Sequence, residues 1–355
     1  MRVIISAGGT GGHIYPALSI VDEILRKSPN SKILYIGTTN RMEKDIVPLH
    51  GIDYYGIKIR GFDRKISLSN FKTIKYFLKA VSECKGKIKE FKPDVVIGVG
   101  GYVTAPVIYA AKKCGVKTII HEQNSVLGMT NKFLSKYADA VLISFRDTKV
   151  NNKKVIFTGN PCGVSNDYNF NKRELGLSNH KKLVLIVMGS LGSKVVNDKM
   201  KNILKSFNDK DYEVLFVTGK DYYEEFKSLK LSKNIVIMPY INDIAKIFNK
   251  VDVMVSRAGA TTISEIIAYK IPTILVPSPY VTDNHQYKNA KSLLDKDAAV
   301  LIEESNLNSD DLVKNIEELL NNKEKINSIR SNLAVLNISN GRELIYEVIN
   351  EIVSG

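Results

Sequence analysis

The most constraining feature of this sequence is a series of short apolar runs separated by longer stretches of helical periodicity. Runs rich in β-branched residues that do not alternate with polar ones are typical of strands buried on both faces of a parallel sheet. They occur in two groups: Val3–Ser6, Ile33–Ile36, Val95–Val99, Thr118–His121, Ala140–Ile143 and Val155–Phe157, then Leu183–Met188, Val214–Thr218, Ile235–Met238, Val251–Val255 and Thr273–Val276. Helical stretches at 16–27, 71–91, 104–113 and 129–136 separate the first group. We therefore predict an α/β fold of two Rossmann-like, doubly wound domains.

The break between the two groups defines the domain boundaries. We assign residues 1–163 to a first domain and 164–340 to a second, which suits a chain of 355 residues. A polar helical stretch, 308–353, follows the last strand. We expect its end, residues 341–355, to form a C-terminal helix that packs back on the first domain.

The net charge of +14 divides unevenly between these domains. Residues 1–163 contain 26 Lys and Arg against 12 Asp and Glu, whereas residues 164–355 contain 25 of each. Within the first domain, residues 58–92 hold 11 basic and 3 acidic side chains, with apolar residues at helical spacing between them. A basic helix with an apolar face is typical of a segment that lies on an anionic membrane surface. The alternative is a core-packed helix with solvated lysines. No nucleic-acid-binding motif occurs, so we expect no nucleic acid partner.

Other sequence features exclude several classes of protein. No apolar run approaches the roughly 20 residues that span a bilayer, and the first strand begins too early for a signal peptide. Cys84, Cys114 and Cys162 have unrelated spacings. We therefore expect neither a disulfide framework nor a zinc site. This cysteine usage fits a protein of the reducing cytoplasm.

Three glycine-rich turns follow predicted strands, at the sheet edge where ligands of such folds bind. They are Gly8–His13, Gly98–Tyr102 and Gly189–Ser193. Glycines allow backbone N–H groups to approach an anion, and the helix behind each turn adds its dipole. A dinucleotide site is the first alternative, but Ile14 stands where the third glycine of that motif belongs and no acid ends the second strand. Each turn taken singly could be no more than a tight strand-to-helix connection.

A fourth cluster lies in the second domain, where Ser256–Glu265 follows a strand. Small residues open a helix here, so N–H groups around Ala260–Thr262 can receive a diphosphate. The Glu265 carboxylate can accept two hydrogen bonds from a ribose diol, or else serve only the helix dipole. The polar segment Asp283–Ala290 suits recognition of sugar hydroxyls, or is a capped, solvated helix start.

Taken together, these motifs resemble the MurG family of bacterial glycosyltransferases along essentially the whole chain. The matching segments are GGTGGHIYPA (8–17), GVGGYVTAP (98–106), HEQNSVLGMTN (121–131), TGNP (158–161), GSLGS (189–193), SRAGATTISE (256–265) and NHQYKNA (284–290). The resemblance implies a GT-B fold, with two domains facing a cleft. It also implies inverting transfer of N-acetylglucosamine from UDP-N-acetylglucosamine to lipid I, giving lipid II, at the cytoplasmic face of the cell membrane. No cofactor and no bound metal ion are expected.

The resemblance also implies roles for individual residues. Thr10, Gly11, Gly12 and Asn124 would lie near the donor sugar, Ser190 near the donor phosphate or uridine, Ile241 near uracil and Gln286 at sugar hydroxyls. Ala260, Thr261, Thr262, Ile263, Ser264 and Glu265 would hold the diphosphate and ribose. Three positions depart from the family: Cys162-Gly163 replace an arginine after the GNP turn, Leu191 replaces a glutamine, and His285 replaces a second glutamine.

Inverting transfer needs a base for the acceptor hydroxyl and stabilisation of the departing diphosphate. His13 is the candidate base, because histidine titrates near neutral pH; its alternative role is to bind acceptor phosphates. Glu122 is a rival base, or it satisfies N–H groups of its own loop. Tyr102 is expected to place the acceptor. Alternative functions are a related GT-B glycolipid synthase, a UDP-N-acetylglucosamine epimerase or a non-catalytic nucleotide-sugar-binding module.

Overall fold

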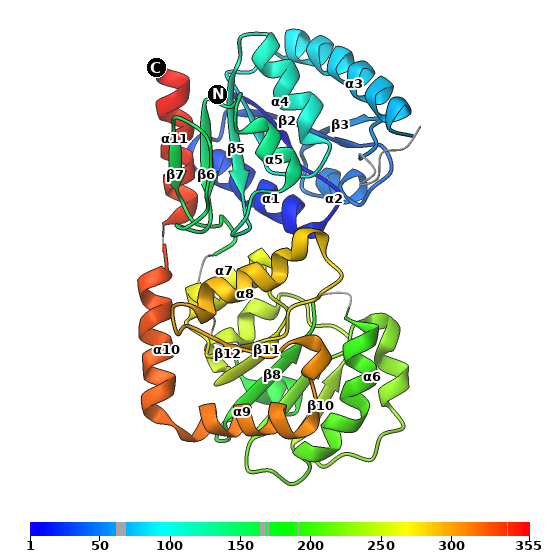
Figure 1. Ribbon diagram of the computed structural model, residues 1–355, viewed down its shortest axis with the longest axis vertical. Coiled ribbons are helices and arrows are strands. Elements are labelled where there is room, and N and C mark those ends of the chain that lie inside the picture. Colours follow the sequence, from blue (N-terminus) through cyan, green and yellow to red (C-terminus); the bar gives the residue numbers. More distant parts are fainter. Residues whose placement is uncertain (62–68, 164–167, 169, 190–191, 339) are drawn as a thin grey trace. The chain divides into compact units, whose positions relative to one another are not determined.

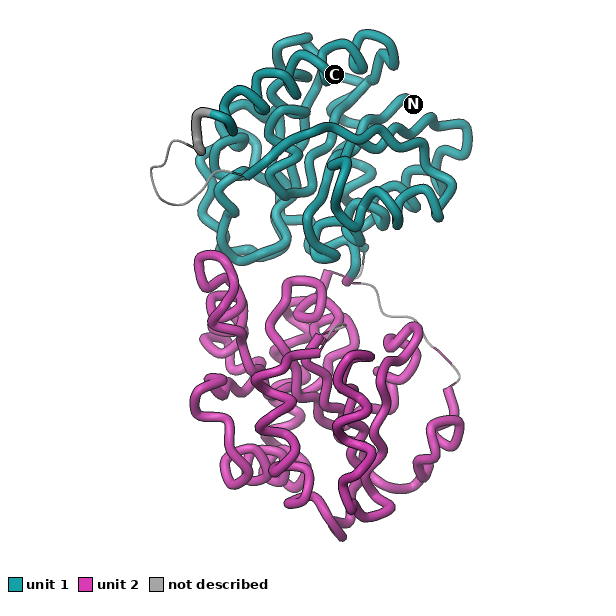
Figure 2. The backbone as a smooth tube through the Cα atoms, turned by 90° about the vertical axis from the view of Figure 1, so that its right-hand side faces the viewer, with its two compact units in different colours: residues 1–162, 340–355 teal, residues 163–339 magenta. Residues whose placement is uncertain are grey.

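The computed structural model describes residues 1–355 except 62–68, 164–167, 169, 190–191 and 339. The chain forms two compact units (Figure 2). Unit 1 comprises Met1–Cys162 together with Asn340–Gly355, and unit 2 comprises Gly163–Ser339. The chain therefore passes between the units twice. Each unit is an α/β layer structure, as the apolar runs predicted.

Unit 1 contains seven parallel strands in the order β3-β2-β1-β4-β5-β6-β7 (Figure 1). The strands are β1 (Arg2–Ser6), β2 (Lys32–Thr38), β3 (Asp53–Ile57), β4 (Val95–Gly98), β5 (Lys117–Glu122), β6 (Ala140–Ile143) and β7 (Val155–Phe157). The connecting helices are α1 (Gly11–Lys27), α2 (Glu43–Leu49), α3 (Ser69–Phe91), α4 (Thr104–Lys113) and α5 (Met129–Leu134).

Burial on both faces of this sheet explains the unbroken apolar runs. Val3 and Ile5 of β1 pack into the core under α1, whereas Ile4 packs into the core under α3 and α4. Successive strand residues point to opposite faces, so consecutive positions in the middle of such a strand are apolar.

Two elements of unit 1 were not predicted. Strand β3 carries Asp53, two tyrosines and a glycine instead of an aliphatic run, and it pairs on only one side because it is the edge of the sheet. Helix α2 has only seven residues, too few for a clear periodicity. In addition, α1 begins at Gly11 and not near Pro16, so the glycine turn itself forms the first turn of the helix.

Unit 2 contains six parallel strands in the order β10-β9-β8-β11-β12-β13. The strands are β8 (Leu183–Val187), β9 (Glu213–Val217), β10 (Ile235–Met238), β11 (Val253–Ser256), β12 (Thr273–Leu275) and β13 (Val300–Leu301). The helices are α6 (Lys194–Ile203), α7 (Ala260–Tyr269), α8 (His285–Leu294), α9 (Ser309–Asn321) and α10 (Lys323–Leu336). Short 3-10 segments occupy Lys172–Leu175, Leu204–Phe207, Lys220–Phe226, Ile244–Lys250, Thr282–Asn284 and Glu304–Asn306.

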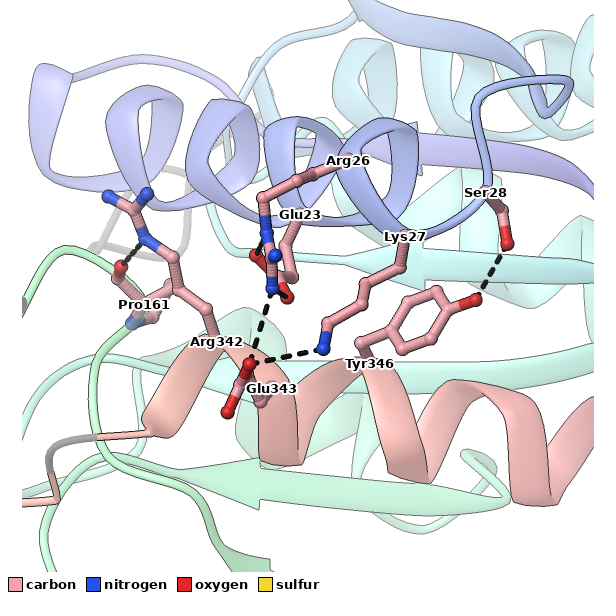
Figure 3. A network of polar contacts seen from close by, with 8 residues as sticks. All are labelled: Glu23, Arg26, Lys27, Ser28, Pro161, Arg342, Glu343 and Tyr346. Carbon is pink, nitrogen blue, oxygen red and sulfur yellow. Dashed lines mark hydrogen bonds and ion pairs between the residues drawn. The ribbon is translucent and has the colours of Figure 1, made fainter.

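The polar stretch 308–353 contains three helices, because Asn322 caps α10 and α10 ends at Leu336. The third, α11 (Gly341–Ser354), packs against α1 in unit 1 (Figure 3). Ile345, Ile349 and Ile352 enter the core beneath α1. At the surface, Glu343 pairs with Arg26 at 3.2 Å and Lys27 at 3.1 Å.

The strand orders locate the ligand-binding edge of each unit. The order reverses between β1 and β4 in unit 1 and between β8 and β11 in unit 2. Loops that leave the carboxyl ends of strands at such a switch point form the binding crevice of doubly wound sheets. These are the loops that begin at Ala7, Val99, Met188 and Arg257, which carry the glycine-rich motifs.

Candidate active site

The first two glycine turns lie against each other at the switch point of unit 1. The Gly8 N–H donates to the Gly100 carbonyl at 3.2 Å. Gly101 adopts a φ of +87°, and a Cβ there would lie 2.3 Å from the Gly8 oxygen. Only glycine permits this backbone contact, so the sequence requirement at 101 is steric.

Three of the residues expected near the donor sugar, Thr10, Gly11 and Gly12, form the N-terminus of α1. Thr10 is the N-cap residue, with extended backbone angles, and Gly11 begins the helix. The first amides of a helix have no intrahelical acceptor, so those of Gly11 and Gly12 are suited to bind an anion.

His13, the candidate base, is held by the same turn. Its Nδ1 lies 3.2 Å from the Gly8 carbonyl oxygen and 3.3 Å from Thr10 Oγ1. A carbonyl oxygen can only accept, so Nδ1 carries the proton and the lone pair of the neutral ring is on Nε2. The ring packs on Gly100, where a Cβ would lie 2.5 Å from Cδ2. This tautomer is the one that general-base catalysis through Nε2 requires.

Glu122, the rival base, is buried at the end of β5 and satisfies its own loop. Its carboxylate accepts from the Asn124 N–H at 3.0 Å, Asn124 Nδ2 at 3.0 Å, the Gly128 N–H at 2.9 Å and Asn131 Nδ2 at 2.9 Å. These contacts support the second of its two expected roles, which is to order the loop that carries Asn124. Tyr102 is half-buried beside Gly61.

The neighbouring His121 has a structural role. Its Nε2 donates to the Gly159 carbonyl at 3.0 Å, and its Nδ1 accepts from Gln123 Nε2 at 3.0 Å. Complete burial lowers the pKa of His121 to about 4, so it is neutral at physiological pH. It ties β5 to the turn that precedes the first passage between the units.

Cys162-Gly163 follow that turn in place of the arginine that the resemblance implies, and an arginine from the C-terminal helix lies beside the turn. Arg342 of α11 donates through Nε to the Pro161 carbonyl at 2.7 Å (Figure 3). It also donates through Nη2 to Ser19 Oγ at 3.4 Å. The residues that supply this contact are 181 positions apart, so no local sequence signal predicts it.

In unit 2, the N-terminus of α7 carries the expected diphosphate site. Gly259 is its N-cap residue, so the amides of Ala260, Thr261 and Thr262 belong to the first turn. The side chain of Ile263 is buried, so only its backbone groups can contact a ligand. The Ser264 hydroxyl donates to the carbonyls of Ala260 (2.7 Å) and Thr261 (2.9 Å), so that its proton is used within the helix.

Glu265 lies in the second turn of α7, and Gln286 lies in the first turn of α8. Burial, reinforced by the Asp243 carboxylate, raises the pKa of Glu265 to about 7. Gln286 Oε1 accepts from the Ser278 N–H at 2.8 Å, which fixes the orientation of its amide and makes its NH₂ group the donor. Ile241 is half-buried in the loop after β10. Ser190 lies outside the described residues.

Arg257, which sequence reasoning did not single out, connects the loops of this edge. Its Nη2 donates to Ser193 Oγ at 2.7 Å and pairs with Glu304, and its Nη1 donates to the Val276 carbonyl at 3.0 Å. The side chain is almost completely buried. It thus braces the glycine turn after β8 against the start of α7. The one sequence feature that could have indicated this role is the presence of an arginine among the small residues of the motif.

Among the described residues, no group of three or more His, Cys, Asp and Glu side chains is arranged to hold a metal ion. Two Asp-Lys-Asp segments, 209–211 and 295–297, precede β9 and β13. They therefore lie at the amino edge of the parallel sheet, opposite the glycine turns.

Comparisons with known proteins show the family to which the chain is similar. The model of the glycosyltransferase family 28 N-terminal domain matches residues 3–143, and that of the family 28 C-terminal domain matches residues 183–344. A protein of Bacillus thuringiensis (strain Al Hakam) is 46% identical over 362 residues, covering 99% of this chain and 100% of its own. It is named UDP-N-acetylglucosamine–N-acetylmuramyl-(pentapeptide) pyrophosphoryl-undecaprenol N-acetylglucosamine transferase 2.

Two solved structures are similar over nearly the whole chain. Acinetobacter baumannii MurG superposes with a TM-score of 0.81 at 28% identity and covers 99% of both chains. A UDP-GlcNAc 2-epimerase from Neisseria meningitidis superposes with a TM-score of 0.67 at 14% identity, covering 99% of this chain and 100% of its own. The second likeness shows a shared fold alone.

Proposed function

The chain belongs to glycosyltransferase family 28, and on that basis we propose that it transfers N-acetylglucosamine from UDP-N-acetylglucosamine to lipid I, giving lipid II in peptidoglycan synthesis. The observation that carries this proposal is the end-to-end match with relatives named for the transfer. The epimerase alternative has support from the fold only.

The residues of unit 1 suit the proton transfer. In a single displacement, an acceptor hydroxyl oxygen attacks the anomeric carbon of N-acetylglucosamine, and the bond from that carbon to the UDP oxygen breaks. The proton passes to His13 Nε2, because Nδ1 already carries a proton directed at the Gly8 carbonyl. Tyr102 and Asn124 are proposed to orient the two sugars.

The residues of unit 2 suit the leaving group. As the bond breaks, negative charge accumulates on the UDP diphosphate. Amides of Ala260–Thr262 at the start of α7, and Ser190, which follows β8 in the sequence, are proposed to stabilise that charge without a metal ion. Glu265 is proposed to accept from the ribose hydroxyls, Ile241 to pack on uracil and Gln286 to bind sugar hydroxyls.

Replacing His13 tests this assignment. In His13→Ala we expect transfer of radiolabelled N-acetylglucosamine to a lipid I analogue to fall at least about 100-fold, while the Kd for UDP changes less than about twofold. His180→Ala, which removes an exposed histidine of unit 2, is the matched control and should retain full turnover. Lost UDP affinity with retained turnover would assign His13 to binding instead. A parallel reaction without acceptor should yield no epimerised donor.

We further propose that unit 1 docks on an anionic membrane surface through an apolar patch. The patch consists of the exposed side chains of Ile74 and Leu78 on α3 and of Met129, Phe133 and Tyr137 on and beside α5. Tyr109 of α4 connects the two parts, with ring centroids 6.0 Å from Phe77 and 6.1 Å from Tyr137.

Exposed lysines lie on and beside the same two helices, namely Lys72, Lys75, Lys79, Lys132 and Lys136. Apolar side chains bordered by cations match the interface of an anionic bilayer, where each basic residue adds about 1 kcal/mol. In the part of the chain that the structure describes, no helix is long and apolar enough to cross a membrane.

A further inference from the structure

Glu43 is a fully buried carboxylate that the proposed reaction does not use. It is the first residue of α2, and its side chain has no exposed surface. Moving a charged carboxylate out of water is costly unless hydrogen bonds replace its hydration. The position of this group therefore needs an explanation.

The hydrogen bonds of Glu43 point to the first glycine turn. Oε1 accepts from the Thr38 N–H at 3.1 Å and Thr38 Oγ1 at 2.7 Å, and Oε2 accepts from the Gly9 N–H at 3.2 Å. All three donors are neutral. Two glycines make room for the side chain, since a Cβ at Gly8 would lie 2.5 Å from Oε1 and one at Gly37 would lie 2.8 Å from Cγ.

The peptide group that donates to Glu43 also accepts from His13. The Gly9 N–H and the Gly8 carbonyl belong to one peptide, and His13 Nδ1 donates to that carbonyl at 3.2 Å. A carboxylate on the N–H side of a peptide polarises it and strengthens its oxygen as an acceptor. Glu43, the peptide and the imidazole thus form one continuous chain of hydrogen bonds.

We propose that Glu43 is a positioning residue that acts on His13 through the Gly8–Gly9 peptide. This series of hydrogen bonds holds His13 in the Nδ1–H tautomer and stabilises the imidazolium that forms when Nε2 takes the acceptor proton. A carboxylate bonded directly to a catalytic histidine has the same two effects. The catalytic part of the proposal rests on His13 being the base, whereas the coupling itself does not.

Other titratable groups lie on the elements around His13. They are Tyr15 on α1, Tyr102 after β4, His121 and Glu122 on β5, and Lys44 and Asp45 on α2, together with Tyr35 on β2 and Tyr54 on β3, which lie near the Glu43 carboxylate. Glu122 accepts from its own loop, and His121 is neutral. Asp45 is exposed on the same helix as Glu43, so Asp45→Asn is a matched control that removes the same charge.

Titration of His13 by NMR tests the coupling without reference to turnover. The chain contains five histidines, and the His13 signal is assigned by its loss in His13→Gln. We expect Glu43→Gln to lower the pKa of His13 by at least about half a unit, because the imidazolium loses its stabilising partner. Asp45→Asn should leave the pKa within about 0.2 unit. An unchanged pKa in Glu43→Gln, with the tautomer retained, would overturn the proposal.

The pH dependence of kcat/KM gives the second readout. Loss of the carboxylate should move the rising limb of the profile to lower pH and reduce kcat about tenfold, with KM for UDP-N-acetylglucosamine unchanged. A purely structural role would lower activity without moving that limb, and this result would contradict the proposal.

A second variant covers the case in which Glu43→Gln does not fold. Thr38→Val removes one donor from the carboxylate and leaves more of its charge to polarise the peptide. It should therefore move the rising limb to higher pH, and a shift to lower pH, or none, would overturn the proposal.

The two assignments fail differently. If His13→Ala retains turnover while Glu43→Gln still shifts the His13 pKa, the base is another group and the coupling stands. If His13→Ala abolishes turnover while that pKa does not respond to Glu43, the base stands and the coupling is wrong.

Discussion

At the scale of residues, several buried polar side chains hold the loops of the candidate site through hydrogen bonds that the sequence did not predict. Glu43 accepts from the Gly9 N–H of the first glycine turn, and Arg257 donates to the Ser193 hydroxyl and to the Val276 carbonyl, so each side chain contacts a segment that lies far away in the sequence. A lone acid after β2 and an arginine within a small-residue motif give no periodic signal. The sequence therefore predicted the glycine turns after the strands, but not the start of α1 at Gly11 or the side chains that hold the turns.

Glu265 provides a prediction in which stability and binding oppose each other. Its pKa is about 7 in the folded protein against 4.5 for the exposed group, so the folded state retains a proton that the unfolded state releases. Stability is therefore lost as the pH rises from about 4.5 through 7. Above pH 7, we expect Glu265→Gln to stabilise unit 2 by about 1 to 2 kcal/mol, raising its Tm by about 2 to 6 °C.

Calorimetry at pH 5 and pH 8 checks this expectation, because the gain should disappear at pH 5. The same variant should weaken UDP binding at pH 8 in isothermal titration, since an amide accepts fewer hydrogen bonds from a ribose diol than a carboxylate does. Glu318→Gln on the exposed side of α9 is the control, with an effect within about 0.5 kcal/mol. Equal stabilisation at both pH values would contradict the assigned pKa.

At the scale of elements, the sequence predicted those whose residues are apolar on both faces. Strands such as β1 and β8 were predictable because all positions of β8, and all positions of β1 after Arg2, are buried. The edge strand β3 and the seven-residue α2 were not, because half-buried tyrosines and a single helical turn or two resemble a loop. The division of 308–353 into three helices depends on Asn322, whose Oδ1 accepts from the Lys325 N–H at 2.9 Å.

Helix α11 gives a prediction that separates core packing from surface charge. Ile349 is fully buried in the core of unit 1, so Ile349→Ala should cost about 3 kcal/mol of unfolding free energy. Glu343→Gln breaks exposed pairs with Arg26 and Lys27 and should cost less than about 1 kcal/mol.

Urea unfolding followed by circular dichroism measures both changes. Val335→Ala, at a side chain that is 84% exposed on α10, is the control and should leave the urea midpoint of unfolding unchanged for both units. A loss from Ile349→Ala no larger than that from Glu343→Gln would mean that α11 is held by its surface pairs.

At the scale of the whole molecule, the charge asymmetry follows the units. Unit 1, with α11, contains 27 Lys and Arg against 15 Asp and Glu, and unit 2 contains 24 against 22. The excess cation thus belongs to the unit that carries the apolar patch, as a membrane-docking role requires.

Vesicle binding tests this role. We expect Leu78→Glu to reduce binding to vesicles rich in anionic phospholipid about tenfold, because a carboxylate replaces an apolar contact that is 62% exposed. Leu49→Glu places the same charge on another exposed leucine of unit 1, outside the patch, and is the matched control. Binding of the parent protein should weaken as salt is added. Equal losses in the two variants would argue for bulk charge and against the patch.

The return of α11 to unit 1 has a consequence during synthesis on the ribosome. The sheet formed by residues 1–162 lacks one of its covering helices until residues 340–355 have been translated, and the 177 residues of unit 2 come in between. Unit 2 is continuous in sequence and can fold as soon as it emerges. The nascent first unit meanwhile exposes the apolar surface that Ile345, Ile349 and Ile352 later cover. The order of maturation is therefore the reverse of the order of translation, and this interval is when the chain is most prone to aggregate.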